Sequence, residues 1–231
     1  MNKKIILIFC LSFLFINTNM LHAEKKEFDY KISGGKLYVF DHVIEPEQGI
    51  KKTNAEDDTI IIFNQSPDGK WIIIQIGADY KTEYWVYNTQ SKLKPHKIKT
   101  EVMGKHSSLL KHENNFFIVN WWHRFPVYNF AEFFTHEQNT HVKQVDFLLL
   151  YDTQLDIYVS AEFGMEDKIL VGKVFSKNSK PIEKEISLGY EYLSDALSFI
   201  KEVQIENDGV KVQYIDKNNT LNSIHINTKN P

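Results

Sequence analysis

Histidine is the residue type whose spacing in this 231-residue chain first suggests chemistry. His136 and His141 stand five residues apart and resemble a metal-binding pair. A zinc-binding helix places two histidines four residues apart on one face, whereas a spacing of five fits neither one helix face nor one strand face. His106 and His112, six apart, would share one face of a strand but not of a helix. The single cysteine lies in the N-terminal apolar run, where it cannot complete a zinc site. We therefore predict no metal site and no cofactor, and histidines that are structural or exposed.

Acidic residues form the second group of candidates, because paired carboxylates perform acid–base chemistry. Asp146 alternates with Val145 and Phe147 in a strongly hydrophobic stretch, so we expect it to point inward and to need a partner. A pairing with Glu132 would suit a glycan-active hydrolase, in which two carboxylates flank the scissile bond. The acidic run at 56–58 is expected to be a solvated loop. The chain contains no nucleophile-elbow, phosphate-loop, calcium-loop or dinucleotide motif, so we assign no catalytic residue.

The densest unusual segment is aromatic, with nine aromatic residues between positions 116 and 134. Two tryptophans are adjacent in it, and in an extended strand they must point to opposite faces. One then enters the core, and the other needs a pocket, a neighbour or a ligand. Because Trp, Tyr and Arg dominate the hot spots of protein interfaces, we predict a partner-binding surface formed by Trp121, Trp122, His123, Arg124 and Tyr128. Two alternatives remain: aromatic residues that only pack a core, and aromatic faces that stack on sugar rings.

The first 23 residues have the pattern of a secretory signal peptide. Lys3 and Lys4 precede a nearly unbroken apolar run at 5–16, and Ala23 is a small residue suited to the cleavage position. The apolar run is shorter than the roughly 20 residues that a membrane span needs. We expect a single β-rich domain at 24–231, located in the periplasm or secreted, with no stable membrane anchor after cleavage. An uncleaved N-terminal anchor is the alternative.

Charge and cysteine content narrow the classes of partner. Without Lys3 and Lys4, 25 Lys and Arg stand against 30 Asp and Glu, a net charge of −5. No basic stripe is available to follow a phosphate backbone, so we expect no nucleic-acid binding. After cleavage no cysteine remains, so the domain forms no disulfide and must be stabilised by its core.

Short runs of β-branched and aromatic residues, bounded by turn signals, favour antiparallel β structure. The strands that these runs predict would hold the candidate side chains described above. Glycine and proline are scarce, at 10 and 6, so no flexible linker is expected. Two segments have helical spacing as well as a loop alternative: Pro126–Asn139 and Glu191–Lys201. The predicted strands are 28–33, 36–43, 59–64, 70–77, 82–88, 95–101, 115–122, 143–151, 155–162, 168–175, 181–187, 200–206, 209–216 and 219–226.

Turn signals recur along the chain at intervals of 34, 46, 53 and 41 residues, at Gly34, Asp68, Asn114, Asp167 and Asp208. A strand ending in Tyr-(Asn/Asp)-Thr-Gln also occurs twice, at 85–90 and 149–154. A period near 40–45 with a four-strand unit is typical of a β-propeller blade. We predict an all-β fold of antiparallel meanders, propeller-like with four or five short blades and one or two short helices. A β-sandwich is the alternative.

Residues 59–101 fit one blade well. Ser66-Pro67-Asp68-Gly69-Lys70-Trp71 precedes a hydrophobic strand, and a second strand ends near Asn88. This stretch resembles a TolB-type propeller repeat, and the resemblance covers about one blade. The residues also explain the turn without a family, because Pro presets φ, Asp bonds its own backbone and Gly supplies a positive φ.

Together these features favour an exported module that acts by binding another protein rather than by catalysis. A specific hypothesis is an immunity or inhibitor protein that neutralises a toxic enzyme, or one that binds an envelope enzyme. The alternatives are a glycan-active hydrolase on a β scaffold and a cell-envelope scaffold protein.

Overall fold

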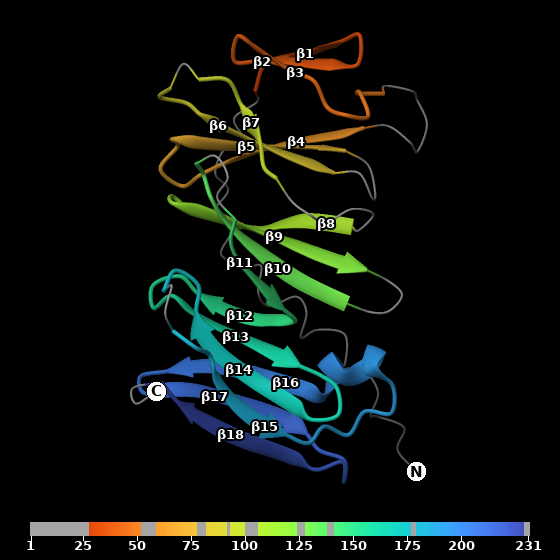
Figure 1. Ribbon diagram of the computed structural model, residues 1–231, viewed down its shortest axis with the longest axis vertical. Coiled ribbons are helices and arrows are strands. Elements are labelled where there is room, and N and C mark those ends of the chain that lie inside the picture. Colours follow the sequence, from red (N-terminus) through yellow and green to blue (C-terminus); the bar gives the residue numbers. More distant parts are fainter. Residues whose placement is uncertain are drawn as a thin grey trace, which may run out of the picture.

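The computed structural model describes residues 28–51, 59–77, 82–91, 93–99, 106–123, 128–137, 141–176 and 179–228. The predicted signal peptide and the acidic run at 56–58 lie outside these ranges. The described residues form five separate antiparallel sheets of three or four strands (Figure 1). This confirms the all-β class with short propeller-like blades and excludes a two-sheet sandwich. No helix within these ranges is long and apolar enough to cross a membrane.

Each sheet consists of strands that follow one another in the chain, and we number the sheets as blades 1 to 5. Blade 1 contains β1 (Tyr30–Ser33), β2 (Lys36–Val39) and β3 (His42–Ile44), and blade 2 contains β4 (Ile60–Gln65), β5 (Trp71–Gly77), β6 (Glu83–Asn88) and β7 (His96–Lys97). Blade 3 contains β8 (His106–His112), β9 (Phe116–His123), β10 (Tyr128–Thr135) and β11 (His141–Asp146). Blade 4 contains β12 (Leu148–Asp152), β13 (Ile157–Glu162), β14 (Asp167–Lys173) and β15 (Ile182–Ile186). Blade 5 contains β16 (Ile200–Glu206), β17 (Gly209–Ile215) and β18 (Leu221–Asn227), and it follows the 3-10 helix η2 (Leu193–Phe199).

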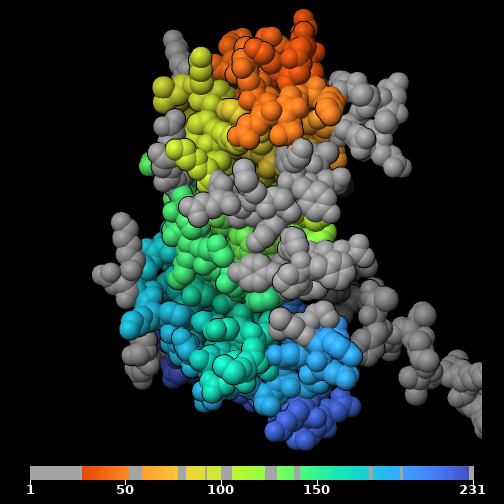
Figure 2. All heavy atoms as spheres, turned by 45° about the vertical axis from the view of Figure 1, so that its right-hand side comes forward, coloured from red at the N-terminus to blue at the C-terminus, as the bar shows by residue number. Residues whose placement is uncertain are grey.

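The blades stack along the long axis of the molecule in chain order, from blade 1 at the red end to blade 5 at the blue end (Figures 1 and 2). Four hydrophobic clusters lie between successive blades. They join blade 1 to blade 2, blade 2 to blade 3, blade 3 to blade 4 and blade 4 to blade 5. None of these clusters joins blade 5 to blade 1, so the described blades form an open stack.

The predicted turn signals correspond to hairpins. Four of the five corners connect the first two strands of blades 1, 2, 3 and 5. The corner at Asp167 instead begins the third strand of blade 4. The unbroken apolar runs at 71–74 and 147–150 predict two strands that are buried on both faces. The interior strand β5 confirms this for the first run, because Ile72 packs towards blade 1 and Ile73 towards blade 3. For the second run the prediction is wrong, since β12 is only half-buried at the edge of its sheet.

The repeated Tyr-(Asn/Asp)-Thr-Gln ending does not mark equivalent positions, because β6 is the third strand of its blade and β12 is the first. The two copies share a local turn. Asn88 Oδ1 accepts a hydrogen bond from the Gln90 N–H at 2.9 Å, and Asp152 Oδ1 accepts one from the Gln154 N–H at 2.8 Å. The similarity therefore reflects side-chain-to-backbone turn chemistry.

Two predicted strands are each divided by residues with positive φ. Phe40 and Asp41, at φ 52° and 60°, form the turn between β2 and β3 within the predicted strand 36–43. Phe147, at φ 44°, separates β11 from β12 within the predicted strand 143–151. A positive φ takes the backbone out of the extended conformation, so the ladder ends there. Neither break could be seen in the sequence, where the predicted strands 36–43 and 143–151 are continuous.

Three further predictions need correction or refinement. The helix expected at 126–139 is wrong, because this segment contains β10, an interior strand that places aromatic residues on both faces. The helical spacing at 191–201 corresponds to the seven-residue helix η2. Strand β8 was not predicted, since its sequence HSSLLKH is mostly polar and only half-buried.

Candidate functional site

The adjacent tryptophans point to opposite faces of β9, as predicted. Trp121 is only 2 % exposed and packs between blades 2 and 3 beside Tyr84 and Phe130. It lies in the core and does not reach a partner directly. Trp122 is 42 % exposed. The partner-binding hypothesis at this strand therefore rests on Trp122.

Trp122 has a neighbour on the strand beside it. His106 of β8 is its cross-strand partner, and the two rings stack with their centroids 4.1 Å apart and their planes 13° from parallel. On the other side Trp122 pairs with Asn129 of β10, whose carbonyl accepts a hydrogen bond from the Phe147 N–H at 2.9 Å. These four residues, His106, Trp122, Asn129 and Phe147, cross one end of blade 3, and we call them the Trp122 row.

The other predicted contact residues are placed only in part. His123 and Tyr128 are cross-strand partners at the ends of β9 and β10, next to Trp122 in the chain. Arg124 lies outside the described residues. The structure therefore brings the backbones of these two residues side by side.

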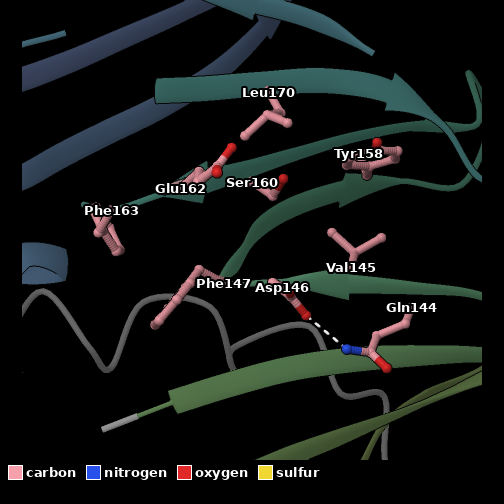
Figure 3. A pocket seen from close by; sticks show the side chains of 10 residues that line it. Gln144, Val145, Asp146, Phe147, Tyr158, Ser160, Glu162, Phe163 and Leu170 are labelled. Carbon is pink, nitrogen blue, oxygen red and sulfur yellow. Dashed lines mark hydrogen bonds between the residues drawn. The ribbon is translucent and has the colours of Figure 1, made fainter. Parts of the chain in front are cut away.

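Phe147, the last residue of the Trp122 row, lines a pocket between blades 3 and 4 (Figure 3). Its volume is about 350 Å³, within the size range of sites that take a small ligand or one large side chain. Blade 3 contributes the end of β11 and Phe147, and blade 4 contributes residues of β13, β14 and the turn between them. The lining residues are Gln144, Val145, Asp146, Phe147, Tyr158, Ser160, Ala161, Glu162, Phe163 and Leu170.

Strand alternation decides which polar groups face this pocket. On β13, Ser160 and Glu162 share the face of Tyr158, which packs against blade 3. The Ser160 side chain is buried, whereas Glu162 is exposed at the rim. Glu162 has no ion pair among the described residues. Lys168, its cross-strand partner, contacts Glu166 at 4.0 Å and Glu183 at 3.5 Å. The rim therefore carries negative charge.

Phe147 fixes one wall of the pocket. Its N–H donates to blade 3, and its carbonyl accepts a hydrogen bond from the Ala161 N–H of blade 4 at 3.2 Å. Its ring meets Phe163 edge to face at 5.0 Å. A bulky residue at positive φ costs free energy and persists only where its surroundings hold it, and such residues are frequent at functional sites.

The predicted acid–base pair is not assembled. Asp146 is exposed and does not point inward, because Val145 takes the buried position on β11. Its carboxylate accepts a hydrogen bond from Gln144 Nε2 at 2.8 Å. Glu132 is 5 % exposed, lies 3.5 Å from His141 Nε2 and does not line the pocket. The two carboxylates therefore do not share a cavity.

A second group of polar side chains, not predicted from the sequence, lies between blades 2 and 3. His112 of β8 lies against His136, which follows β10, and His96 of β7 lies near His136; we call these three residues the histidine cluster. The Nε2 atoms of His112 and His136 are 3.0 Å apart, and His136 stacks on Trp71 at 4.8 Å. The turn of Ser66 to Lys70 borders the cluster, since the Asp68 N–H donates to Asn114 Oδ1 of the neighbouring blade at 2.8 Å.

The expectation that His106 and His112 share a strand face is wrong. Between Leu109 and Lys111 the pairing of β8 with β9 shifts by one residue. Such a bulge turns the following side chains to the other face. His106 therefore faces Trp122, and His112 faces Phe117 in the core.

Burial keeps the histidine cluster neutral at neutral pH. It is the largest cause that lowers the pKa of His112 to about 3 and of His136 to about 4. Nearby Asp68 partly opposes this effect at both rings. Burial also lowers the pKa of His96, which a backbone hydrogen bond with Glu137 partly restores. His96 Nε2 and His112 Nδ1 are buried without a hydrogen bond among the described residues.

Comparison with solved structures returns propeller-like enzymes at low similarity. A prolyl endopeptidase gives a TM-score of 0.36 and 11 % identity over 85 % of this chain and 31 % of its own. Oligopeptidase B from Trypanosoma brucei gives a TM-score of 0.33 and 8 % identity, over 85 % of this chain and 32 % of its own. A Bacteroides uniformis protein described as a 6-phosphogluconolactonase gives a TM-score of 0.28 and 12 % identity, over 87 % of this chain and 68 % of its own. The chain thus spans about a third of the length of the two peptidases. No family model and no curated protein matches it.

Proposed function

We propose that the protein is an exported module that binds another protein through the Trp122 row and the pocket beside it. The observation that carries this proposal is the exposed Trp122 ring, which is stacked on His106 in the same row as Phe147, a residue that lines the pocket. A large aromatic anchor next to a concave site is the usual arrangement of an interface hot spot. Stacking before binding also lowers the entropy lost when the partner docks.

The pocket suits a positively charged side chain of the partner. Glu162 supplies the negative charge at the rim, and Ser160 lies deeper on the same face. Phe147 and Phe163 add aromatic rings, which attract a cation approaching their faces. The predicted net charge of −5 after cleavage agrees with a basic partner.

The specific role that we propose is that of a periplasmic immunity or inhibitor protein, which neutralises a toxic enzyme by occupying its surface. The leader pattern, the acidic balance and the aromatic segment support it. We further propose that blade 2 is a TolB-type blade, because its first hairpin contains the Ser66–Lys70 turn.

Affinity measurements on matched variants test the binding site. The wild-type protein would capture its partner from periplasmic extract, and the purified partner would then be titrated against each variant. Trp122→Ala should weaken binding by about 2 kcal/mol, or roughly 30-fold. Glu162→Gln should weaken it less and reduce its salt dependence. Leu155→Ala is the matched control, since Leu155 is 51 % exposed on a hairpin of blade 4 and does not line the pocket.

Two results would contradict the proposal. One is an extract that yields no stable partner. The other is a partner that binds Trp122→Ala as tightly as it binds the wild-type protein.

A further inference from the structure

We propose that the partner's side chain that enters the pocket between blades 3 and 4 is an arginine, and that Ser160 is the residue that selects it. This inference rests on the proposed function, from which it takes the partner protein, and it adds the chemistry that the pocket recognises. In the complex the guanidinium lies between the Glu162 carboxylate at the rim and the Ser160 hydroxyl, which is deeper on the same face of β13.

The Ser160 hydroxyl is a buried polar group that the fold leaves without a partner. Ser160 is only 4 % exposed and lines the pocket, and its hydroxyl makes no hydrogen bond among the described residues. The other buried polar side chains in the same part of the chain each make a hydrogen bond or an ion pair, namely those of Ser66, Glu83, Glu132 and His136. A buried hydroxyl without a partner is unfavourable and calls for an explanation. A donor from a ligand in the pocket provides one.

The charged side chains that line the pocket are both acidic. They are Asp146 and Glu162, and the lining residues that the structure describes include no lysine, arginine or histidine. The Asp146 carboxylate already accepts a hydrogen bond from Gln144 (Figure 3), whereas Glu162 has no hydrogen bond and no ion pair within the described part of the chain. A carboxylate beside a concave site attracts a cation more strongly than one in open water, because less solvent screens it. The group that enters the pocket is therefore a cation.

The spacing of the two acceptors favours a guanidinium over an ammonium group. Ser160 and Glu162 are two residues apart on one strand face, which separates them by about 7 Å along β13. An ammonium carries its three donors on one nitrogen, whereas a guanidinium spreads five N–H donors over three nitrogens in a rigid plane. A guanidinium can donate to the carboxylate from one edge and to the hydroxyl from another. An ammonium paired with Glu162 leaves Ser160 without a donor.

The aromatic walls of the pocket also suit a planar cation. Phe147 and Phe163 lie at one end of the pocket and Tyr158 at the other (Figure 3). The Tyr158 ring already has the ammonium of Lys143, a residue of this chain, 4.5 Å from its centroid. The partner's cation is therefore placed at the end formed by Phe147 and Phe163. Arginine stacks flat on aromatic rings and is more weakly hydrated than an ammonium, so its burial there costs less free energy.

Titration with capped amino acids tests the pocket without the partner. The full chain, exported with its own leader and labelled with ¹⁵N, is titrated with Nα-acetyl-arginine amide, Nα-acetyl-lysine amide and Nα-acetyl-citrulline amide, which has the shape of arginine without its charge. The readout is the shift of the backbone amide resonances around Ser160 and Glu162. We expect the arginine amide to bind at least about 5-fold more tightly than the lysine amide, because it alone reaches the hydroxyl. The citrulline amide should bind most weakly.

Matched variants assign the preference to single groups. Ser160→Ala should weaken binding of the arginine amide by about 10-fold and that of the lysine amide by less than about twofold, since a hydrogen bond to a charged group is lost only with arginine. Glu162→Gln should weaken binding of both cations. Ser223→Ala and Glu202→Gln are the controls, because both residues are exposed on blade 5 and do not line the pocket. Neither control should change the affinity for either amide.

Three results would overturn the arginine pocket: no binding of the arginine amide, equal affinity for the arginine and lysine amides in the wild-type protein, or an unchanged preference in Ser160→Ala. The first two need no variant, so they decide the question even if a substitution impairs folding. The titration is also separate from the test of the proposed function. A partner that requires Trp122, together with no binding of the arginine amide, would refute this inference alone. Binding of the arginine amide, together with an extract that yields no partner, would refute the proposed function alone.

Discussion

Acid should weaken the contact between blades 2 and 3 because the buried rings of His112 and His136 resist protonation. In the folded protein their pKa values are about 3 and about 4, below the ordinary value of 6.5. Between pH 7.5 and 5.0 the unfolded chain therefore binds protons at both rings, and the folded chain does not. Their contribution to stability is complete above pH 6.5 and is lost as the pH falls towards 4 and then 3.

The magnitude follows from the two pKa shifts. At pH 5.0 a ring with an unfolded pKa of 6.5 and a folded pKa of 4 or below favours the unfolded state by about 2 kcal/mol relative to pH 7.5. The two rings together lower the free energy of unfolding by about 4 kcal/mol. A domain has only about 5–15 kcal/mol in total, so the change is large.

Urea unfolding, followed by tryptophan fluorescence with EDTA present, measures this effect at pH 7.5, 6.5, 5.5 and 5.0. The wild-type free energy of unfolding should fall steadily across this range. The His112→Gln/His136→Gln variant should show a fall smaller by about 4 kcal/mol. His225→Gln, an exposed histidine on blade 5, should behave as the wild-type protein does. If the double variant and the wild-type protein had the same pH dependence, the two rings would not be the buried neutral groups described above.

Two substitutions test the turns that join the strands, each by the same urea measurement. In Gly209→Ala the new Cβ would lie 2.2 Å from a backbone carbonyl oxygen of β18, so we expect a loss of about 3 kcal/mol. Gly164→Ala, where no atom lies within 4 Å of the new Cβ, should change little, and an equal loss would refute the steric reasoning. Ser66 Oγ donates to Asp68 at 2.7 Å and accepts from the first N–H of β5 at 3.0 Å, so Ser66→Ala should cost about 1–2 kcal/mol. Exposed Ser179 is its control, and an equal effect of Ser179→Ala would count against this account.

The strands could be predicted because they obey local rules. The turn signals at Gly34, Asp68, Asn114 and Asp208 mark first hairpins of blades, since positive φ and short polar side chains are needed where a chain reverses. Phe147 shows the limit of these rules. Nothing in the run of apolar residues around it signals a positive φ, because the cause is its hydrogen bonds to two different blades.

The two sites differ in how far the sequence could reveal them. Trp122 could be predicted because adjacent residues on a strand face opposite ways, a rule that needs no tertiary information. The histidine cluster could not, since His112 and His136 meet across blade 3 although they are far apart in the chain, and His96 joins them only when blade 2 stacks on blade 3. The one available signal was the position of each residue at a strand end or turn. Spacing arguments within one strand also failed at β8, where a bulge reverses the faces.

The open stack of blades has a consequence for how the molecule comes apart. Each hydrophobic cluster joins only two successive blades, so each blade is stabilised by its direct neighbours alone, as in a repeat array. Blades 1 and 5 each have one blade face without a neighbouring cluster, and thermal opening should therefore begin at these ends and move inward. The last junction to open would then be the middle of the stack, at blade 3, which carries Trp122 and two of the three histidines on its opposite faces.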